Sequence, residues 1–158
     1  MNKILLLVIS IIVCLAAGFI GSLFTTTGPN SWYSNINKPS FNPPGWIFGP
    51  VWTTLYILMG ISLFLVLQKG LPNTHVKIAV LIFAVQLVLN ILWSVLFFGM
   101  QSPMLALIEI ALLWVFILLT IINFYPISRT ASFLLIPYIL WVTFAAILNF
   151  SIFMLNKA

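Results

Sequence analysis

The chain has 158 residues, of which 63% are hydrophobic and only 4% are charged, and its mean hydropathy is +1.25. Soluble domains carry about 25% charged residues, so six Lys/Arg and one acidic residue cannot cover a soluble protein of this size. The net charge of +5 comes from scattered single cations, which are typical of membrane-helix flanks and do not indicate a nucleic-acid partner. The single Cys14 excludes an intrachain disulfide, and no Cys/His cluster indicates a metal site, with the lone His75 expected in a loop.

Five apolar segments are each long enough to cross roughly 30 Å of hydrocarbon, which takes about 20 helical residues. They cover residues 4–24, 45–67, 78–98, 104–124 and 131–155. Closed β-barrels need alternating polar positions, which these runs lack. We therefore predict an all-α integral membrane protein with a single membrane domain over residues 1–158. It is a five-transmembrane-helix bundle, in which the long first loop, residues 25–44, forms an ordered lid.

The first segment begins with a lysine followed by an apolar run, as a signal peptide does. The run continues past Gly18 without a clean cleavage site, so we expect a retained helix. Its small residues, spaced for close helix contact, serve either packing within the bundle or a dimer, and the sequence leaves both open. They are Ala17, Gly18, Gly21 and Ser22.

The loop between the first two segments is rigid and aromatic. Its prolines exclude a helix over residues 38–44, because each lacks a donor and restricts the residue before it. A loop of roughly 20 residues is too long for a simple connection, and its position over one end of the bundle predicts a lid. The residues assigned to this lid are Trp32, Tyr33, Lys38, Pro39 and Pro44.

Three of the segments carry aromatic residues, two of them mixed with amides, at helical spacing, so each set shares one face. The sets are Phe48, Trp52 and Tyr56; Gln86, Asn90, Trp93 and Phe97; and Tyr138, Trp141, Ala145 and Asn149. They fit either helix packing, in which amides contribute about 0.6 kcal/mol each, or a pocket with flat aromatic walls. The residues alone do not decide between these interpretations.

Glu109 is the only acid, and it lies in the fourth segment. An acid inside a membrane indicates either a functional group or a neutral, hydrogen-bonded structural one. No span holds a Lys, Arg or His partner for it, which argues against a proton-coupled pump.

The charge distribution predicts the orientation. Four cations, Lys3, Lys69, Lys77 and Arg129, belong to the end with the N-terminus, and two, Lys38 and Lys157, to the other. Because cytoplasmic loops are enriched in Lys and Arg, we expect a cytoplasmic N-terminus and an external lid.

Residues 32–60, WYSNINKPSFNPPGWIFGPVWTTLYILMG, resemble the tryptophan-rich sensory protein family, also called the translocator protein or peripheral benzodiazepine receptor family. LNILWSVLFFG and PYILWVTFAAILNF in later segments agree, and the resemblance covers essentially the whole chain. It implies a homodimeric five-helix bundle whose cavity, capped by the first loop, binds porphyrins and hydrophobic synthetic drugs. The short tails are typical of a bacterial member, so we expect a multi-pass protein of a bacterial cell membrane.

Transferred to this chain, the ligand-binding residues implied by the resemblance are Pro43, Trp52, Tyr56, Asn90, Trp93, Trp141, Ala145 and Leu148. They overlap the three faces found by spacing and favour the pocket interpretation. The cholesterol motif of animal members needs a tyrosine shortly before a basic residue. Here Phe150 replaces that tyrosine and Lys157 lies too far along, so the sequence does not support sterol binding.

Three classes of function fit these features: a receptor for tetrapyrroles, a transporter of them, and an enzyme that acts on a bound porphyrin. No inverted repeat or broken helix pair supports transport, and no nucleophile–base pair supports ordinary catalysis. No cofactor is required, because porphyrin is itself the ligand or substrate. We expect a receptor, with light-dependent porphyrin degradation through Trp52 and Trp141 as its most plausible activity and transport as the alternative.

Overall fold

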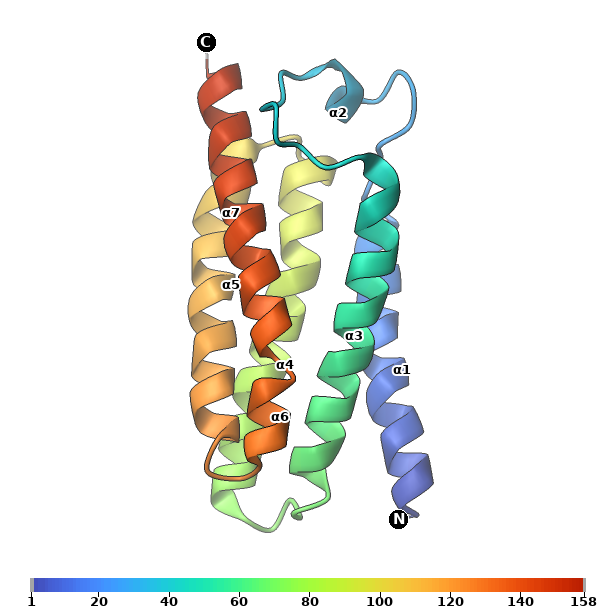
Figure 1. Cartoon of the computed structure of the whole chain (residues 1–158), viewed down its shortest axis with the longest axis vertical. Coiled ribbons are helices and arrows are strands. Elements are labelled where there is room, and N and C mark those ends of the chain that lie inside the picture. Colours follow the sequence, from blue (N-terminus) through green and yellow to red (C-terminus); the bar gives the residue numbers. More distant parts are fainter. Residues whose placement is uncertain (1, 158) are drawn as a thin grey trace.

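The computed structural model describes residues 2–157 and contains the five predicted membrane spans. The helices are α1 (Lys3–Ser22), α2 (Trp32–Asn35), α3 (Gly45–Leu67), α4 (Thr74–Ser94) with the π-helical turn η1 (Val95–Gly99), α5 (Pro103–Phe124), α6 (Arg129–Phe133) and α7 (Ile136–Asn156). The long helices lie side by side, and the lid segment with α2 covers the end opposite the N-terminus (Figure 1). The chain is thus a multi-pass, all-α membrane bundle, as the sequence predicts.

Glycines allow α1 to pack tightly against α3. A Cβ atom on Gly60 would lie 2.5 Å from the Cα of Ile11, and one on Gly18 would lie 2.3 Å from a ring carbon of Tyr56. On the adjoining face, Gly21 approaches Ser94 of α4. Gly18 and Gly21 of the first span therefore serve packing within the bundle, whereas Ser22 is exposed and the dimer role of this span stays a prediction.

The third span is longer than predicted at its N-terminal end. It begins at Thr74 rather than residue 78, because the side chain of Asn73 accepts a hydrogen bond from the backbone N–H of His75 and caps the helix. The prediction that His75 lies in a loop is therefore wrong, since it lies in the first turn of α4. The span ends in η1, whose wider turn carries Phe97 and Phe98 toward the lid segment.

The fifth span is two helices rather than the single predicted one. The α6 segment is capped by Ser128 and ends at Phe133, and α7 starts at Ile136 with Pro137 in its first turn. Proline lacks the N–H that would continue the hydrogen bonding of a single helix, so the chain restarts there. At this end α6 packs against α3, and Ser62 Oγ donates a hydrogen bond of 2.7 Å to the backbone carbonyl of Ala131. Because α3 packs against α6 far more than against α7, the two spans diverge toward the lid.

The lid segment is ordered and tied to the C-terminal end of α7. Ser31 caps the single turn of α2 through a hydrogen bond from Ser34. Asn156 accepts from the backbone N–H of Asn37 at 2.9 Å and donates to its carbonyl at 2.8 Å. This pair of bonds imitates backbone pairing and fixes the middle of the lid against the bundle.

Candidate functional site

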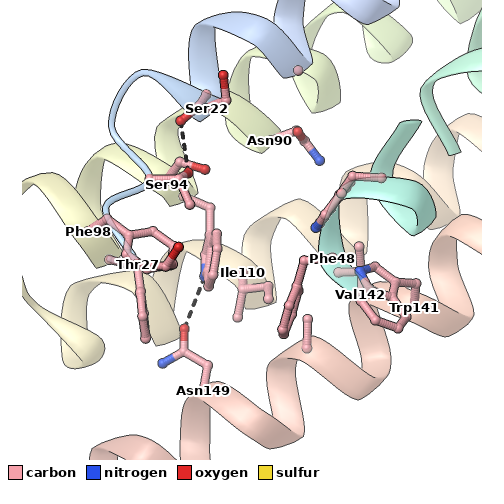
Figure 2. A pocket seen from close by; sticks show the side chains of 18 of the residues that line it. Ser22, Thr27, Phe48, Asn90, Ser94, Phe98, Ile110, Trp141, Val142 and Asn149 are labelled. Atoms are coloured by element: carbon pink, nitrogen blue, oxygen red, sulfur yellow. Dashed lines mark hydrogen bonds between the residues drawn. The ribbon is translucent and has the colours of Figure 1, made fainter. Parts of the chain in front are cut away.

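A cavity of about 470 Å³ lies inside the lid-side half of the bundle. Residues from α1, α3, α4, η1, α5 and α7 line it, together with a few from the first loop (Figure 2). Its volume is within the roughly 300–1,000 Å³ of ligand pockets. At the end with the N-terminus α3 packs against α6, and toward the lid α3 and α7 diverge. This divergence leaves the space in which the cavity forms.

Seven of the eight predicted ligand-binding residues come together on the cavity wall. They are Trp52, Tyr56, Asn90, Trp93, Trp141, Ala145 and Leu148. Pro43, two residues before α3 begins, lies outside this lining set. Ligand contact by these eight residues stays a prediction. The cavity nevertheless brings together residues from three spans, which had been grouped only by their helical spacing and by the family resemblance.

The two tryptophans singled out for photochemistry, Trp52 and Trp141, lie on helices that face each other. Trp52 stacks on Tyr56 with ring centroids 5.6 Å apart and meets Tyr138 edge-on at 6.2 Å. Trp141 meets Phe48 edge-on at 5.9 Å. Such pairs are each worth about 0.5–1.5 kcal/mol beyond burial, so the indoles form rigid, flat walls.

A chain of hydrogen bonds fixes the polar groups at the inner side of the cavity. The Tyr56 hydroxyl donates to Oδ1 of Asn90, and Nδ2 of Asn90 donates to the Tyr138 hydroxyl at 2.9 Å. The Tyr138 hydroxyl in turn donates to Oε1 of Gln86 at 2.9 Å. Gln86 and Tyr138 lie behind the wall rather than on it. They hold Asn90, which lines the cavity, in one orientation.

Two indole N–H groups near the cavity differ in their partners. Trp93 donates to Asn149 at 3.0 Å, and Asn149 donates to the carbonyl of Pro103 at 2.8 Å (Figure 2). The Nε1 atom of Trp141 is buried and has no acceptor among the described residues. A buried donor without a partner costs about 1–3 kcal/mol, so the position of Trp141 is held at a cost in stability.

The lid reaches the cavity mainly through Tyr33. Of the five predicted lid residues, only Tyr33 lines it; Trp32, Lys38, Pro39 and Pro44 do not. The ammonium of Lys38 lies 4.8 Å from the Tyr33 ring centroid, and the Tyr33 hydroxyl donates to Asn42 at 3.1 Å. Burial raises the pKa of Tyr33 above 10.0, although the bond to Asn42 opposes the shift. The hydroxyl therefore stays neutral at ordinary pH.

Several lining residues were missed by sequence reasoning. Ser94 and Phe98 continue the helical face of Asn90 at steps of four, and this signal could have revealed them. The apolar residues Leu15, Ile110 and Leu113 carry no such signal, since they look like any other residue of a membrane helix. Among the described residues, the lining set contains no carboxylate, imidazole or thiol. The lining is therefore mainly apolar and aromatic, with a few hydroxyl, amide and indole N–H groups.

Glu109 is not part of this site. It is 5% exposed on the core face of α5, and neither of its carboxyl oxygens has a hydrogen-bond partner among the described residues. The carboxyl group of Glu109 therefore lacks the hydrogen bonds that the structural interpretation of this residue assumed.

Replacing Glu109 by leucine should stabilise the protein. An apolar side chain of similar size removes a buried polar group whose burial without a partner costs about 1–3 kcal/mol. The temperature of unfolding in detergent should rise for Glu109→Leu and stay near the original value for Glu109→Gln. A lower unfolding temperature for Glu109→Leu would show that the carboxyl group makes a stabilising interaction.

The comparisons with known proteins agree with this architecture. The sequence model of the TspO/MBR family matches residues 10–155. The chain is 52% identical over 157 residues to the tryptophan-rich protein TspO of Chlorobaculum tepidum, which covers 99% of both chains. It is 48% identical over 155 residues to the protein of the same name from Archaeoglobus fulgidus, covering 98% of this chain and 99% of the relative. It is also 36% identical over 135 residues to the translocator protein of Homo sapiens, covering 85% of this chain and 80% of the relative.

Proposed function

Because the chain belongs to the TspO/MBR family, we propose that it is a membrane receptor that binds porphyrins and hydrophobic drug-like molecules in the cavity described above. The cavity of about 470 Å³ between Trp52 and Trp141 is the observation that carries the proposal. A porphyrin is flat and aromatic, so stacked indole and phenol rings suit its faces. Asn90, which Tyr56 and Tyr138 hold in place on the cavity wall, supplies a polar group for its edge.

On this basis we also propose light-dependent degradation of bound protoporphyrin. An indole ring stacked on an excited porphyrin can donate one electron, which oxidises the indole and reduces the porphyrin. Dissolved dioxygen is then the oxidant for the later steps. Trp52 and Trp141 are the candidate donors because both rings line the cavity.

Absorption spectroscopy of the purified protein with protoporphyrin, in the dark and under illumination, tests both proposals. Binding should shift the main band in the dark, and degradation should replace it with a new product in the light. Ala145→Phe is the matched variant, because a large ring beside Trp141 fills the cavity while overpacking costs only about 1–3 kcal/mol. An equal dark shift in the folded Ala145→Phe variant would contradict binding in this cavity.

Transport is the alternative, and the name translocator protein given to the human relative is the reason to test it. Movement of protoporphyrin across proteoliposomes in the dark would favour a carrier over a receptor.

If the lid closes over bound ligand, amide hydrogen exchange in residues 30–44 should slow when protoporphyrin is added. The reason is that Tyr33 lines the cavity and Asn37 is tied to α7. Exchange in the loop of residues 68–73, at the opposite end of the bundle, should not change (Figure 1). Equal protection of both loops would contradict a specific lid.

A further inference from the structure

The cavity is open on one side only. Among the lining residues that the structure describes, those from α4, η1, α5 and α7 are buried or partly buried. The exposed ones fall in two short segments, at the end of α1 with the loop after it and in the first turns of α3. They are Phe19, Ser22, Thr25 and Thr27 on one side and Gly45, Gly49 and Thr53 on the other. A residue that is both exposed and on the cavity wall marks an opening, so the mouth lies between α1 and α3.

This mouth extends from the lid end down the side of the bundle. Thr53 is the ninth residue of α3, which places it about 12 Å along the helix axis from its start. Phe19 lies within α1 and is 67% exposed, as a lipid-facing aromatic ring would be. Figure 2 shows Ser22 and Thr27 at the edge of the cavity formed by α1 and the loop. The lid covers the end of the bundle, whereas the mouth opens through its side.

Small residues line the α3 side of the mouth, and the hydroxyl groups of Thr53 and Ser22 already have hydrogen-bond acceptors. A Cβ atom on Gly45 or Gly49 would meet nothing within 4 Å, so no packed side chain fills the opening there. The hydroxyl of Thr53 donates to the carbonyl of Gly49 at 2.9 Å, and that of Ser22 donates to Phe19 at 2.6 Å. Their polar hydrogens are satisfied within their own helices, which leaves a passage that an apolar molecule can cross without displacing hydrogen bonds.

We infer that the slot between α1 and α3 is a lateral portal through which apolar ligands dissolved in the lid-side leaflet reach the cavity. The inference rests on the proposed function, because it assigns a route to the ligands proposed there. Thr53 and Gly49 form its edge on α3, where a larger side chain would slow the passage of a ligand. A molecule that partitions into the membrane first is thereby favoured over one that stays in water.

The portal can be tested with proteoliposomes and a small apolar aryl diazirine dissolved in the bilayer and photolysed shortly after mixing. Mass spectrometry then compares labelling of Ala145, on the cavity wall, with labelling of Leu140, which is 64% exposed on the lipid face of the same helix. The Ala145-to-Leu140 ratio should fall by about tenfold in Thr53→Phe, because a large ring at the mouth blocks passage. Gly49→Phe should act in the same way and serves if Thr53→Phe does not fold.

Thr54→Phe is the matched control. Thr54 is exposed, does not line the cavity, and loses the same kind of hydrogen bond, from its hydroxyl to the carbonyl of Pro50 at 2.9 Å. It should leave the labelling ratio unchanged. An unchanged ratio in folded Thr53→Phe and Gly49→Phe would overturn the portal and place the route elsewhere.

Protoporphyrin added to the same vesicles separates this inference from the proposed function. Thr53→Phe should slow association and dissociation alike, by about tenfold, and keep the affinity within about threefold, because an obstacle at the mouth raises the barrier in both directions. If diazirine labelling depends on Thr53 but no variant binds protoporphyrin, the portal stands and the porphyrin proposal fails. If protoporphyrin binds and the Thr53→Phe rates match those of Thr54→Phe, the portal fails and the porphyrin proposal stands.

Discussion

Trp52→Phe and Trp141→Phe should each slow light-driven loss of bound protoporphyrin by well over tenfold while leaving its affinity within about tenfold, or about 1.4 kcal/mol. Phenylalanine keeps most of the stacking that Trp52 makes with Tyr56 and Trp141 with Phe48. It is a far poorer electron donor than indole, so the chemistry should suffer much more than the binding. The measurement is the decay of the main absorption band under constant illumination, beside a dark titration of the same variant.

Trp114→Phe is the control for this experiment. Trp114 lies on α5 outside the cavity lining, where its Nε1 donates to Thr143 at 2.8 Å. Its replacement should change neither affinity nor decay. Original decay rates in both Trp52→Phe and Trp141→Phe would mean that the indoles are only walls and that free porphyrin sensitises oxygen by itself.

Gly60→Ala should strongly destabilise the protein. The new methyl group would lie 2.5 Å from the Cα of Ile11, and backbone cannot swing aside as a side chain can. Overpacking of this kind costs about 1–3 kcal/mol, and here it separates α1 from α3 along the wall that holds Tyr56. We expect a clear drop in the unfolding temperature in detergent and weaker binding of protoporphyrin.

The same substitution at Gly49, in the same helix, is the control. A Cβ atom there meets nothing within 4 Å, and alanine favours a helix interior by up to about 1 kcal/mol over glycine. Gly49→Ala should therefore keep or raise the unfolding temperature. Equal effects of the two substitutions would show that close packing at Gly60 is not what holds α1 to α3.

The sequence predicted α3 to the residue because Pro43 and Pro44 exclude a helix before Gly45. It did not predict the break before α7, since a proline in an apolar run fits a kink, a restart or a continuous helix start. The link between Asn37 and Asn156 was equally hidden, because asparagines 119 positions apart carry no mark of contact.

For the candidate site, helical spacing found the residues that differ chemically from their surroundings, such as Asn90 and Trp141. It could not separate a lining residue from one behind the wall, and Gln86 shares the face of Asn90 yet only supports it. The glycines of the mouth were missed because glycine in a membrane helix indicates close packing as readily as open space. Only the position of neighbouring atoms distinguishes Gly60 from Gly49.

The contact between α3 and α6 has a consequence for the choice between receptor and carrier. A carrier must present its site to the two aqueous compartments in turn, so each end of the bundle has to close and release. At the end with the N-terminus, the buried hydrogen bond from Ser62 to Ala131 holds the second and fifth spans together. Opening the cavity toward this end would require breaking that contact. A carrier would have to break this hydrogen bond in every transport cycle, whereas a receptor can work with it intact.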